Sequence, residues 1–298
     1  MMDFFKKKNI EKFRNYIIEK KYSCYYNKNP LKIKVLSIAE TLDYILDNNS
    51  SVVRYGDGEI SLIEGNDIVF QSYNKELVDR LKTIANTDNN DEFLVCLPDV
   101  FSTLDLYVPK SKKIWAINRH IHRGTFEKLF TGNFYGNSFI SRPYQIYKDK
   151  EPSEKYFTKM KKIWEKKDLL IVEGKNSRTG VGNDLFSNTN SIRRIICPSK
   201  DAYDIYDEIL EEIIKECNDK LIFIMLGPTA KFLVHDLYLR GYQAIDLGHI
   251  DTEYEWFKMS ATEKVRIPNK HTAEFVDNIV YEYNEKYESE ILSDLTYL

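Results

Sequence analysis

The feature that most limits the possible folds of this sequence is a series of short apolar runs separated by longer amphipathic stretches. Several runs are continuously hydrophobic, as strands buried on both faces of a parallel sheet must be. The strand-like runs are residues 51–56, 92–98, 113–118, 138–142, 168–174, 193–198, 220–228 and 243–248. The helical patterns between them are residues 74–87, 153–167, 201–217 and 229–241. This alternation predicts an α/β fold, with a Rossmann-like, doubly wound and mostly parallel sheet.

The region before the first strand differs from the rest of the chain in charge. Residues 1–34 hold ten Lys and Arg against three Asp and Glu, although the whole chain has a net charge of −3. Residues 3–21 have the spacing of an amphipathic helix, and a second helix is expected over 37–47, with Ser37 as its N-cap. We therefore divide the chain into a basic helical segment, residues 1–36, and one large domain, residues 37–298. The basic segment suits weak contact with a membrane surface or a partner protein, or is simply a solvated helix.

Composition excludes several broad classes of protein. A net charge of −3 gives no general case for binding nucleic acid. The four cysteines form no CxxC pair, which is typical of a reducing compartment. No run approaches 18 apolar residues and the first residues do not resemble a signal peptide. The sequence thus predicts a cytoplasmic protein with no transmembrane segment and no nucleic-acid partner.

Ligands of doubly wound sheets bind beyond the carboxyl ends of the strands, and four polar segments follow strands here. The first is Arg54-Tyr55-Gly56-Asp57-Gly58-Glu59. Its glycines permit a tight turn that can bring both carboxylates to one spot, where a hard divalent cation would accept them together with phosphates and water. We predict Asp57 and Glu59 as metal ligands, with Arg54 and Gly56 in contact with a phosphate-bearing ligand. The alternative is a solvated acidic turn.

The second segment is the glycine-rich loop over residues 173–186, which follows the strand at 168–174. Its glycines allow a ligand to approach the backbone closely, and Arg178 is available to neutralise phosphate. The spacing is not that of a P-loop. We predict that Arg178 and Gly180 bind the same phosphate-bearing ligand, the alternative being a surface loop.

The third segment follows the most hydrophobic strand and opens a helix with Gly227, Pro228 and Thr229. A proline is well tolerated in the first turn of a helix, and the free N–H groups of that turn attract anions. These three residues are predicted to bind the phosphates, the alternative being an ordinary strand–helix junction.

The fourth segment, residues 246–257, gathers one histidine and four acids, interleaved with Tyr254 and Trp256, which suit stacking on a sugar or a base. A histidine among acids at a strand end is a candidate for acid–base chemistry or metal binding. The candidate catalytic residues are His249, Asp251, Glu253 and Glu255. Two other histidines, His120 and His122, are expected to follow a strand and to line the same cleft.

Together the four segments, R-Y-G-D-G-E, V-E-G-K-N-S-R-T-G-V-G-N-D-L-F, L-G-P-T-A-K and D-L-G-H-I-D-T-E-Y-E-W-F, resemble the GT-D type glycosyltransferases over residues 37–270. These are bacterial enzymes of pathways that decorate surface glycoproteins and polysaccharides. The resemblance implies a UDP-sugar donor, a glycan or glycopeptide acceptor, and a divalent metal, Mn²⁺ or Mg²⁺. It also implies that Asp57 and Glu59 hold this metal and that the segment from His249 to Glu255 lies near the reaction centre.

The chemistry of such a transfer needs two things from the protein. Charge that develops on the leaving diphosphate must be stabilised, by a cation together with Arg178 or a helix N-terminus. An inverting transfer also needs a base for the acceptor hydroxyl, and among the four candidates Glu255 is favoured. We therefore expect a glycosyltransferase, specifically a hexosyltransferase. The alternatives are a non-catalytic nucleotide- or glycan-binding module and a metal-dependent nucleotide phosphohydrolase.

Overall fold

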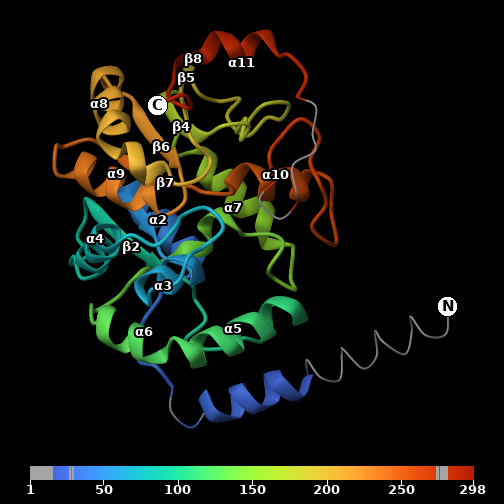
Figure 1. Ribbon diagram of the computed structural model, residues 1–298. Coiled ribbons are helices and arrows are strands. Elements are labelled where there is room, and N and C mark those ends of the chain that lie inside the picture. Colours follow the sequence, from blue (N-terminus) through green and yellow to red (C-terminus); the bar gives the residue numbers. More distant parts are fainter. Residues whose placement is uncertain (1–15, 27, 29, 273–274, 276–280) are drawn as a thin grey trace.

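The computed structural model describes residues 16–26, 28, 30–272, 275 and 281–298 (Figure 1). Eight parallel strands form one sheet in the order β3-β2-β1-β7-β6-β4-β5-β8. The strands are β1 (Ser51–Arg54), β2 (Phe93–Leu97), β3 (Gly136–Asn137), β4 (Asp168–Gly174), β5 (Ser191–Cys197), β6 (Leu221–Met225), β7 (Ala244–Asp246) and β8 (Ile291–Asp294). The predicted fold class, a parallel α/β sheet, is confirmed.

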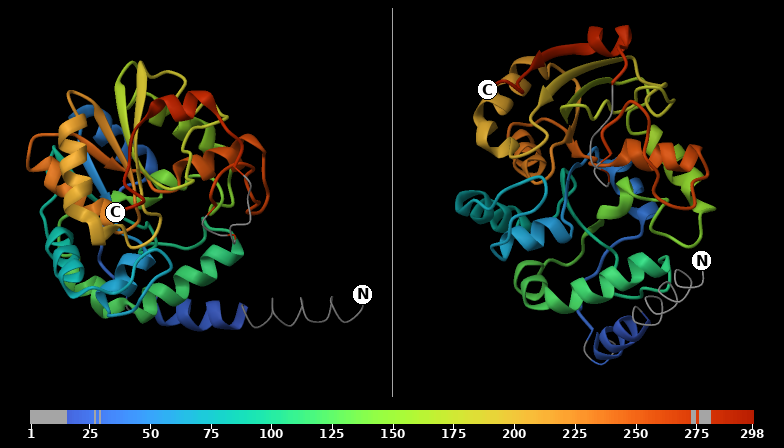
Figure 2. Two further views of the ribbon diagram at one scale, coloured as in Figure 1. Left: turned by 45° about the horizontal axis from the view of Figure 1, so that its top comes forward. Right: turned by 45° about the vertical axis from the view of Figure 1, so that its right-hand side comes forward.

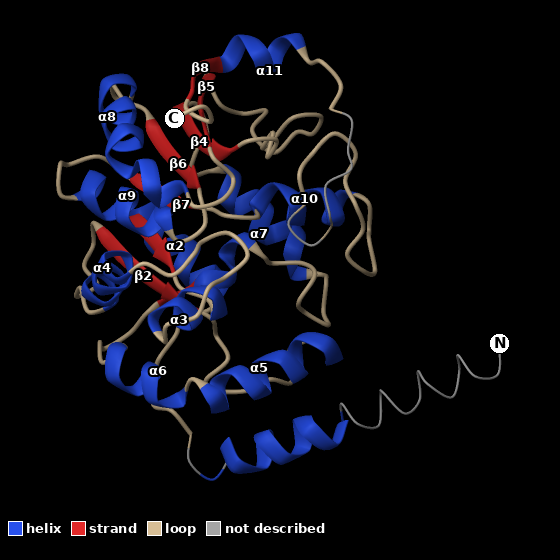
Figure 3. Cartoon of the chain, in the orientation of Figure 1, coloured by secondary structure: helices blue, strands red, loops and turns tan. Residues whose placement is uncertain are grey.

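Helices cover both faces of the sheet, with α4, α8 and α9 on one side and α2, α7 and α10 on the other (Figure 3). Besides residues 16–26, the helices are α2 (Ile38–Asn48), α3 (Asp57–Ile63), α4 (Lys75–Ala85), α5 (Pro109–Ile121), α6 (Arg123–Leu129), α7 (Pro152–Lys161), α8 (Tyr206–Glu216), α9 (Thr229–Tyr238), α10 (Ile250–Lys258) and α11 (Glu285–Glu290), with 3₁₀ turns η1 (Ser138–Ser141) and η2 (Ala202–Ile205). Strands β2 and β6 are buried along their whole length, which explains their uninterrupted apolar sequences. Of the residues that the structure describes, no helix combines the length and apolar character needed to span a membrane.

The order of the strands places a crevice near the middle of the sheet. From β1 the chain moves outward to β2 and β3, crosses to β4 and β5 in the other half, and returns through β6 to β7, which pairs with β1. Strands are thus added in opposite directions on the two sides of the β1–β7 pair. The loops that follow β1 and β7 therefore diverge, and a ligand can enter between them. The first and fourth polar segments leave the sheet here, at the ends of β1 and β7.

Two predicted strands are wrong. Residues 113–118 lie inside α5, which begins at Pro109 and buries Trp115, Ala116 and Arg119 on one face. That spacing is helical, and the short run of Ile, Trp, Ala and Ile was too brief for its period to be recognised. Residues 138–142 form η1 instead of a strand. The sequence also did not reveal β8, whose register with β5 shifts at an irregularity.

The N-terminal region packs against α5, below the sheet in Figure 1 and in both views of Figure 2. The Tyr26 hydroxyl donates to the Phe101 carbonyl at 2.7 Å, and the Arg119 guanidinium lies 3.7 Å from the centre of the Tyr26 ring. Part of the predicted helix 3–21 lies outside the described residues. The second predicted helix is confirmed as α2, where Ser37 and Glu40 form a reciprocal capping box.

Candidate active site

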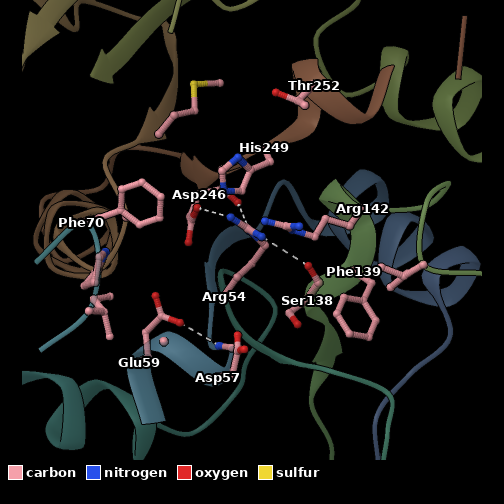
Figure 4. A pocket seen from close by; sticks show the side chains of 18 of the residues that line it. Arg54, Asp57, Glu59, Phe70, Ser138, Phe139, Arg142, Asp246, His249 and Thr252 are labelled. Atoms are coloured by element: carbon pink, nitrogen blue, oxygen red, sulfur yellow. Dashed lines mark hydrogen bonds and ion pairs between the residues drawn. The ribbon is translucent and has the colours of Figure 1, made fainter. Parts of the chain in front are cut away.

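A cavity of about 750 Å³ opens at the carboxyl ends of β1, β4, β6 and β7. Its walls come from the β1–α3 turn, the β6–α9 turn, the start of α10, one end of α5 and residues 262–271. In Figure 4, Phe70 lies on one side of the Arg54–Asp246 pair, and Phe139 and Arg142 lie on the other. All four polar segments therefore reach one cavity. The first, third and fourth do so with some of the residues that were predicted to bind or to catalyse, and the glycine-rich loop does so with Gly174, Ser177 and Thr179.

The β1–α3 turn presents its two acids differently. Asp57 is exposed, lines the cavity and makes no hydrogen bond or ion pair within the described part of the chain. Glu59 is buried, with Oε2 accepting the backbone N–H of Gly56 at 2.8 Å and Oε1 only 2.7 Å from Lys231 Nζ. The Glu59 carboxylate thus closes the first turn of α3. Of these two acids, Asp57 is the one whose carboxylate is left to bind a ligand in the cavity.

Arg54 is used to join neighbouring strands. Its Nη2 and Nε donate to Asp246 Oδ1 and to the Asp246 carbonyl, both at 2.7 Å, and its Nη1 donates to Ser141 Oγ at 2.6 Å. Burial would raise the pKa of the Asp246 carboxyl, but Arg54 and Lys231 outweigh it and lower that pKa. Arg54 lines the cavity, yet most of its donors already bind β7 and η1.

Lys231, in the first turn of α9, was missed by the sequence reasoning. Its Nζ lies 2.7 Å from Glu59 Oε1, 3.1 Å from Asp246 Oδ2 and 3.1 Å from the Gly227 carbonyl. The available signal was a lysine within an otherwise apolar helix sequence, T-A-K-F-L-V, since a buried lysine requires acceptors. Lys231 joins the β1–α3 turn to the β7 end in one buried charge cluster.

The β6–α9 turn brings Gly227 and Pro228 to the cavity wall. Gly227 adopts a φ of +52°, a left-handed conformation that favours glycine. The ten-residue helix α9 follows directly, and the Ala230 and Lys231 N–H groups of its first turn donate to the Gly227 and Pro228 carbonyls at 3.3 and 3.1 Å. Thr229 is fully buried and is not part of the cavity wall.

The two residues of the glycine-rich loop that were predicted to bind the ligand, Arg178 and Gly180, do not line the cavity. The Arg178 guanidinium lies over the Tyr287 ring, 5.2 Å from its centre, and Gly180 donates its N–H to Asp251 Oδ1 at 2.9 Å. The buried carboxylate of Glu173 fixes the conformation of the glycine-rich loop. It accepts the Thr179 N–H at 2.8 Å and pairs with Arg194 at 2.7 Å. A predicted role of Arg178 at the phosphates remains a prediction, but its side chain packs on the C-terminal region in this structure.

The four candidate catalytic residues of the fourth segment separate into two pairs. His249 and Asp251 line the cavity, whereas Glu253 and Glu255 do not. Asp251 accepts hydrogen bonds from Gly180 N and Asn183 Nδ2 at Oδ1, and its Oδ2 accepts one from Lys270 Nζ at 2.7 Å. Burial raises the pKa of the Asp251 carboxyl, although Lys270 opposes this.

The other two acids bind parts of the protein. Glu255 Oε1 accepts from Asn183 Nδ2 and Lys270 Nζ, each at 2.7 Å. Glu253 is fully buried, and its Oε2 accepts the backbone N–H groups of Tyr144 and Gln145 at 3.2 and 3.0 Å. Burial raises the pKa of Glu253. Glu253 therefore holds the loop that carries Arg142 and Gln145 to the cavity.

The histidines of α5 do not line the cavity. Because residues 113–118 are helical, His120 points to the N-terminal helix, where it packs against Tyr22 and Tyr25. His122 Nδ1 lies 2.8 Å from Glu64 Oε2. The expectation that both follow a strand into the cleft is wrong.

Fold and cavity together define an α/β protein whose ligand site combines an acidic turn, a helix N-terminus and a buried acid at one edge of a parallel sheet. The model of the glycosyltransferase GT-D fold family matches residues 52–275. The chain belongs to this family, which confirms the resemblance of its four polar segments to the GT-D type glycosyltransferases.

Two curated relatives are similar to most of this chain. A probable glycosyl transferase, Gly, of Streptococcus gordonii is 46% identical over 266 residues, 89% of this chain and 39% of that protein. The glycosyltransferase GlyD of Streptococcus pneumoniae serotype 4 is 45% identical over 263 residues, 88% of this chain and 32% of that protein. The chain thus spans between about a third and two fifths of the length of these relatives.

Solved structures agree with this assignment. A structure of the highly conserved domain of unknown function 1792, described as having a distinct glycosyltransferase fold, is 48% identical with a TM-score of 0.88, covering 94% of this chain and 99% of that one. Another, described as a new glycosyltransferase from Streptococcus sanguinis, is 46% identical with a TM-score of 0.87, covering 89% and 100%.

Proposed function

We propose that this chain transfers a hexose from a UDP-sugar to a glycan or glycopeptide acceptor, in a divalent-metal-dependent reaction. One observation carries the proposal: a single cavity holds an exposed carboxylate, Asp57, the N-terminal turn of α9 and a buried acid, Asp251. These are the parts needed to bind a diphosphate, to stabilise its departure and to accept a proton.

The donor diphosphate fits best at the start of α9. The positive end of the α9 dipole favours an anion, and Gly227 allows it to approach the backbone. Phe70, Ile68 and Met225 add an apolar wall, which suits the base or sugar of the donor. This division assigns the phosphates to Gly227 and Pro228 in preference to Arg178.

The residues of the β1–α3 turn fit a divalent cation that is shared with the donor. Within the described residues no group of three or more His, Cys, Asp and Glu is arranged to hold a metal. Mn²⁺ or Mg²⁺ needs only one or two carboxylates when phosphates and water complete its shell. Asp57 would hold it, while Glu59 fixes the turn and is already paired with Lys231. When bound, the cation stabilises the negative charge that develops on the leaving diphosphate.

The base is best assigned to Asp251, because it lines the cavity and Glu255 does not. A carboxylate has about four acceptor directions, and three of those of Asp251 are taken by Gly180, Asn183 and Lys270. The remaining direction, on Oδ2, is free to accept the proton of an acceptor hydroxyl. His249 lies two residues earlier, at the N-cap of α10, and completes this wall.

The acceptor and the cellular setting extend the proposal beyond the cavity. We take the acceptor to be a glycan on a bacterial surface glycoprotein or a polysaccharide precursor, built in the cytoplasm. Membership of the family supports both parts of this proposal. Lys110 and Ile114 of α5 and Lys264 also line the cavity, and we assign the acceptor sugar to this part of its wall.

Incubation with several UDP-sugars and Mn²⁺, with and without acceptor glycans, tests the reaction by measuring UDP release and sugar transfer. We expect acceptor-dependent transfer that EDTA abolishes and Mn²⁺ restores. Asp57→Asn should lose transfer by orders of magnitude with an unchanged melting temperature, whereas Asp79→Asn, on the exposed face of α4, should match the wild type.

A binding measurement separates the donor from the chemistry. UDP with Mn²⁺ should raise the melting temperature, because it binds only the folded state. A shift with another nucleotide but not with UDP would show that the donor class is wrong. Free phosphate release without an acceptor would indicate a phosphohydrolase, and nucleotide binding without turnover would indicate a binding module.

A further inference from the structure

Lys270 occupies an unusual position for a lysine, since its side chain is buried at the back of the cavity wall. Its Nζ lies 2.7 Å from Asp251 Oδ2 and 2.7 Å from Glu255 Oε1. The lysine is 4% exposed, and Asp251 is 5% exposed. Lys270 belongs to the segment 262–272, and the N–H of the next residue, His271, donates to the Asn176 carbonyl at 2.8 Å. The ammonium thus joins segments that are distant in sequence.

The surroundings of Asp251 determine whether its carboxyl is charged. Lys270 provides the positive charge, and Glu255 provides a competing negative charge one turn along α10. His249 and His271 line the same cavity. The glycine-rich loop contributes only neutral donors, one backbone N–H and one amide. A buried carboxylate without its cation is strongly disfavoured, so Lys270 is the group that opposes protonation of Asp251.

We propose that Lys270 is a positioning residue that keeps the Asp251 carboxylate ionised and directed toward the acceptor, and that Glu255 moderates this effect by sharing the same ammonium. This inference rests on the proposed role of Asp251 as the base. Glu255, which does not line the cavity, is then expected to affect the reaction by setting the proton affinity of its neighbour. The segment 262–272, which carries Lys270, is likewise expected to be required for turnover.

Opposite shifts follow for the two partners. Lys270→Met removes the cation and leaves two buried carboxylates together, so the pKa of Asp251 rises. Glu255→Gln removes the competing charge and leaves the ammonium to Asp251, so that pKa falls. Because a base must be ionised to act, the acidic limb of the kcat/KM profile should move with this pKa. We expect an upward movement of about one pH unit or more in Lys270→Met, which is about a tenfold loss of kcat/KM below the limb.

The experiment is a set of pH–rate profiles for the wild type, Lys270→Met, Lys270→Arg and Glu255→Gln. Lys270→Arg keeps the charge and should leave the limb near its wild-type position. Lys161→Met is the matched control, since Lys161 also contacts α10, through the Tyr254 hydroxyl at 2.9 Å, but does not contact Asp251. Its profile should be that of the wild type.

A measurement without turnover distinguishes failure of this inference from failure of the proposed function. The Asp251 carboxyl can be followed by ¹³C NMR across pH, with Asp251→Asn identifying its signal. A rise in the pKa of the Asp251 carboxyl in Lys270→Met and a fall in Glu255→Gln would support the inference even if no donor were turned over. If Lys270→Met unfolds, Glu255→Gln still decides, because it removes no cation. The inference would be overturned if Glu255→Gln, or a folded Lys270→Met, left both quantities unchanged. These are the position of the acidic limb of the kcat/KM profile and the pH at which the Asp251 carboxyl signal titrates.

Discussion

Replacing Lys231 by methionine should destabilise the whole domain, because the lysine neutralises two carboxylates that are largely buried. The ammonium lies 2.7 Å from Glu59 Oε1 and 3.1 Å from Asp246 Oδ2. The three side chains are exposed by only 4%, 11% and 2%. Methionine has nearly the same length and shape, so the change removes the charge without creating a large cavity. Asp246 keeps Arg54 as a partner, whereas Glu59 keeps only the Gly56 N–H.

The magnitude follows from the cost of leaving a buried charge without its partner. Removing one member of a buried ion pair destabilises proteins by about 3–5 kcal/mol. For a chain of 298 residues the entropy of unfolding near 60 °C is about 0.6 kcal/mol per degree, so we expect a fall in melting temperature of about 5–8 °C. An exposed lysine in a similar pair, Lys215 with Glu212, provides the comparison: Lys215→Met should leave the melting temperature nearly unchanged, because solvent screens the pair.

Urea unfolding at pH 7 and at pH 4 provides the assay. The pKa of Asp246 is lowered in the folded state, so its favourable interactions are present above the pKa of an unfolded aspartate and are lost as pH falls through the lowered value. The deficit of Lys231→Met should therefore be large at pH 7 and smaller in acid, where Asp246, without the Lys231 charge that lowers its pKa, can take a proton. A variant as stable as the wild type at pH 7 would refute the reasoning, because it would show that the cluster is hydrated or neutral.

Two further predictions concern stability elsewhere. Burial raises the pKa of Asp99, which accepts a hydrogen bond from Tyr107, to about 6, so its contribution to stability is present below about pH 4 and lost as pH rises through about 6. Asp99→Asn should abolish this dependence and gain about 2–3 kcal/mol at pH 7 relative to pH 4 in urea unfolding, and an equal effect at both pH values would contradict it. Gly248 has a φ of +47°, and an added Cβ would collide with the Arg54 guanidinium, so Gly248→Ala should lose about 2–3 kcal/mol. Gly241→Ala, with a φ of +83° and open space around it, isolates the cost of the backbone, and equal losses in the two variants would exclude the collision.

The sequence by itself determined the architecture and the edge of the sheet at which the site lies. Continuous apolar runs at β4 and β6 predicted buried strands, and polar turns that directly follow parallel strands must gather at one edge. The helix cap was also predicted correctly: Ser37 and Glu40 cap α2, because a capping box involves residues only three positions apart. Asp57 was placed at a strand end on the same local grounds, and it lines the cavity.

Only the tertiary structure decided which polar side chains face the cavity and which bind other parts of the protein and so fix the cavity walls. Arg54 and Arg178 were predicted to bind phosphate, but one contacts Asp246 across 192 residues and the other packs on Tyr287. Glu255 and Asp251 lie on the same helix, and only the rotation of α10 against the sheet brings Asp251 to the cavity wall. Lys231 and Lys270 acquire their roles from acceptors on other segments. A sequence pattern records spacing along one element, whereas the pairing of buried charges depends on contacts between elements, which the packing of the whole fold fixes.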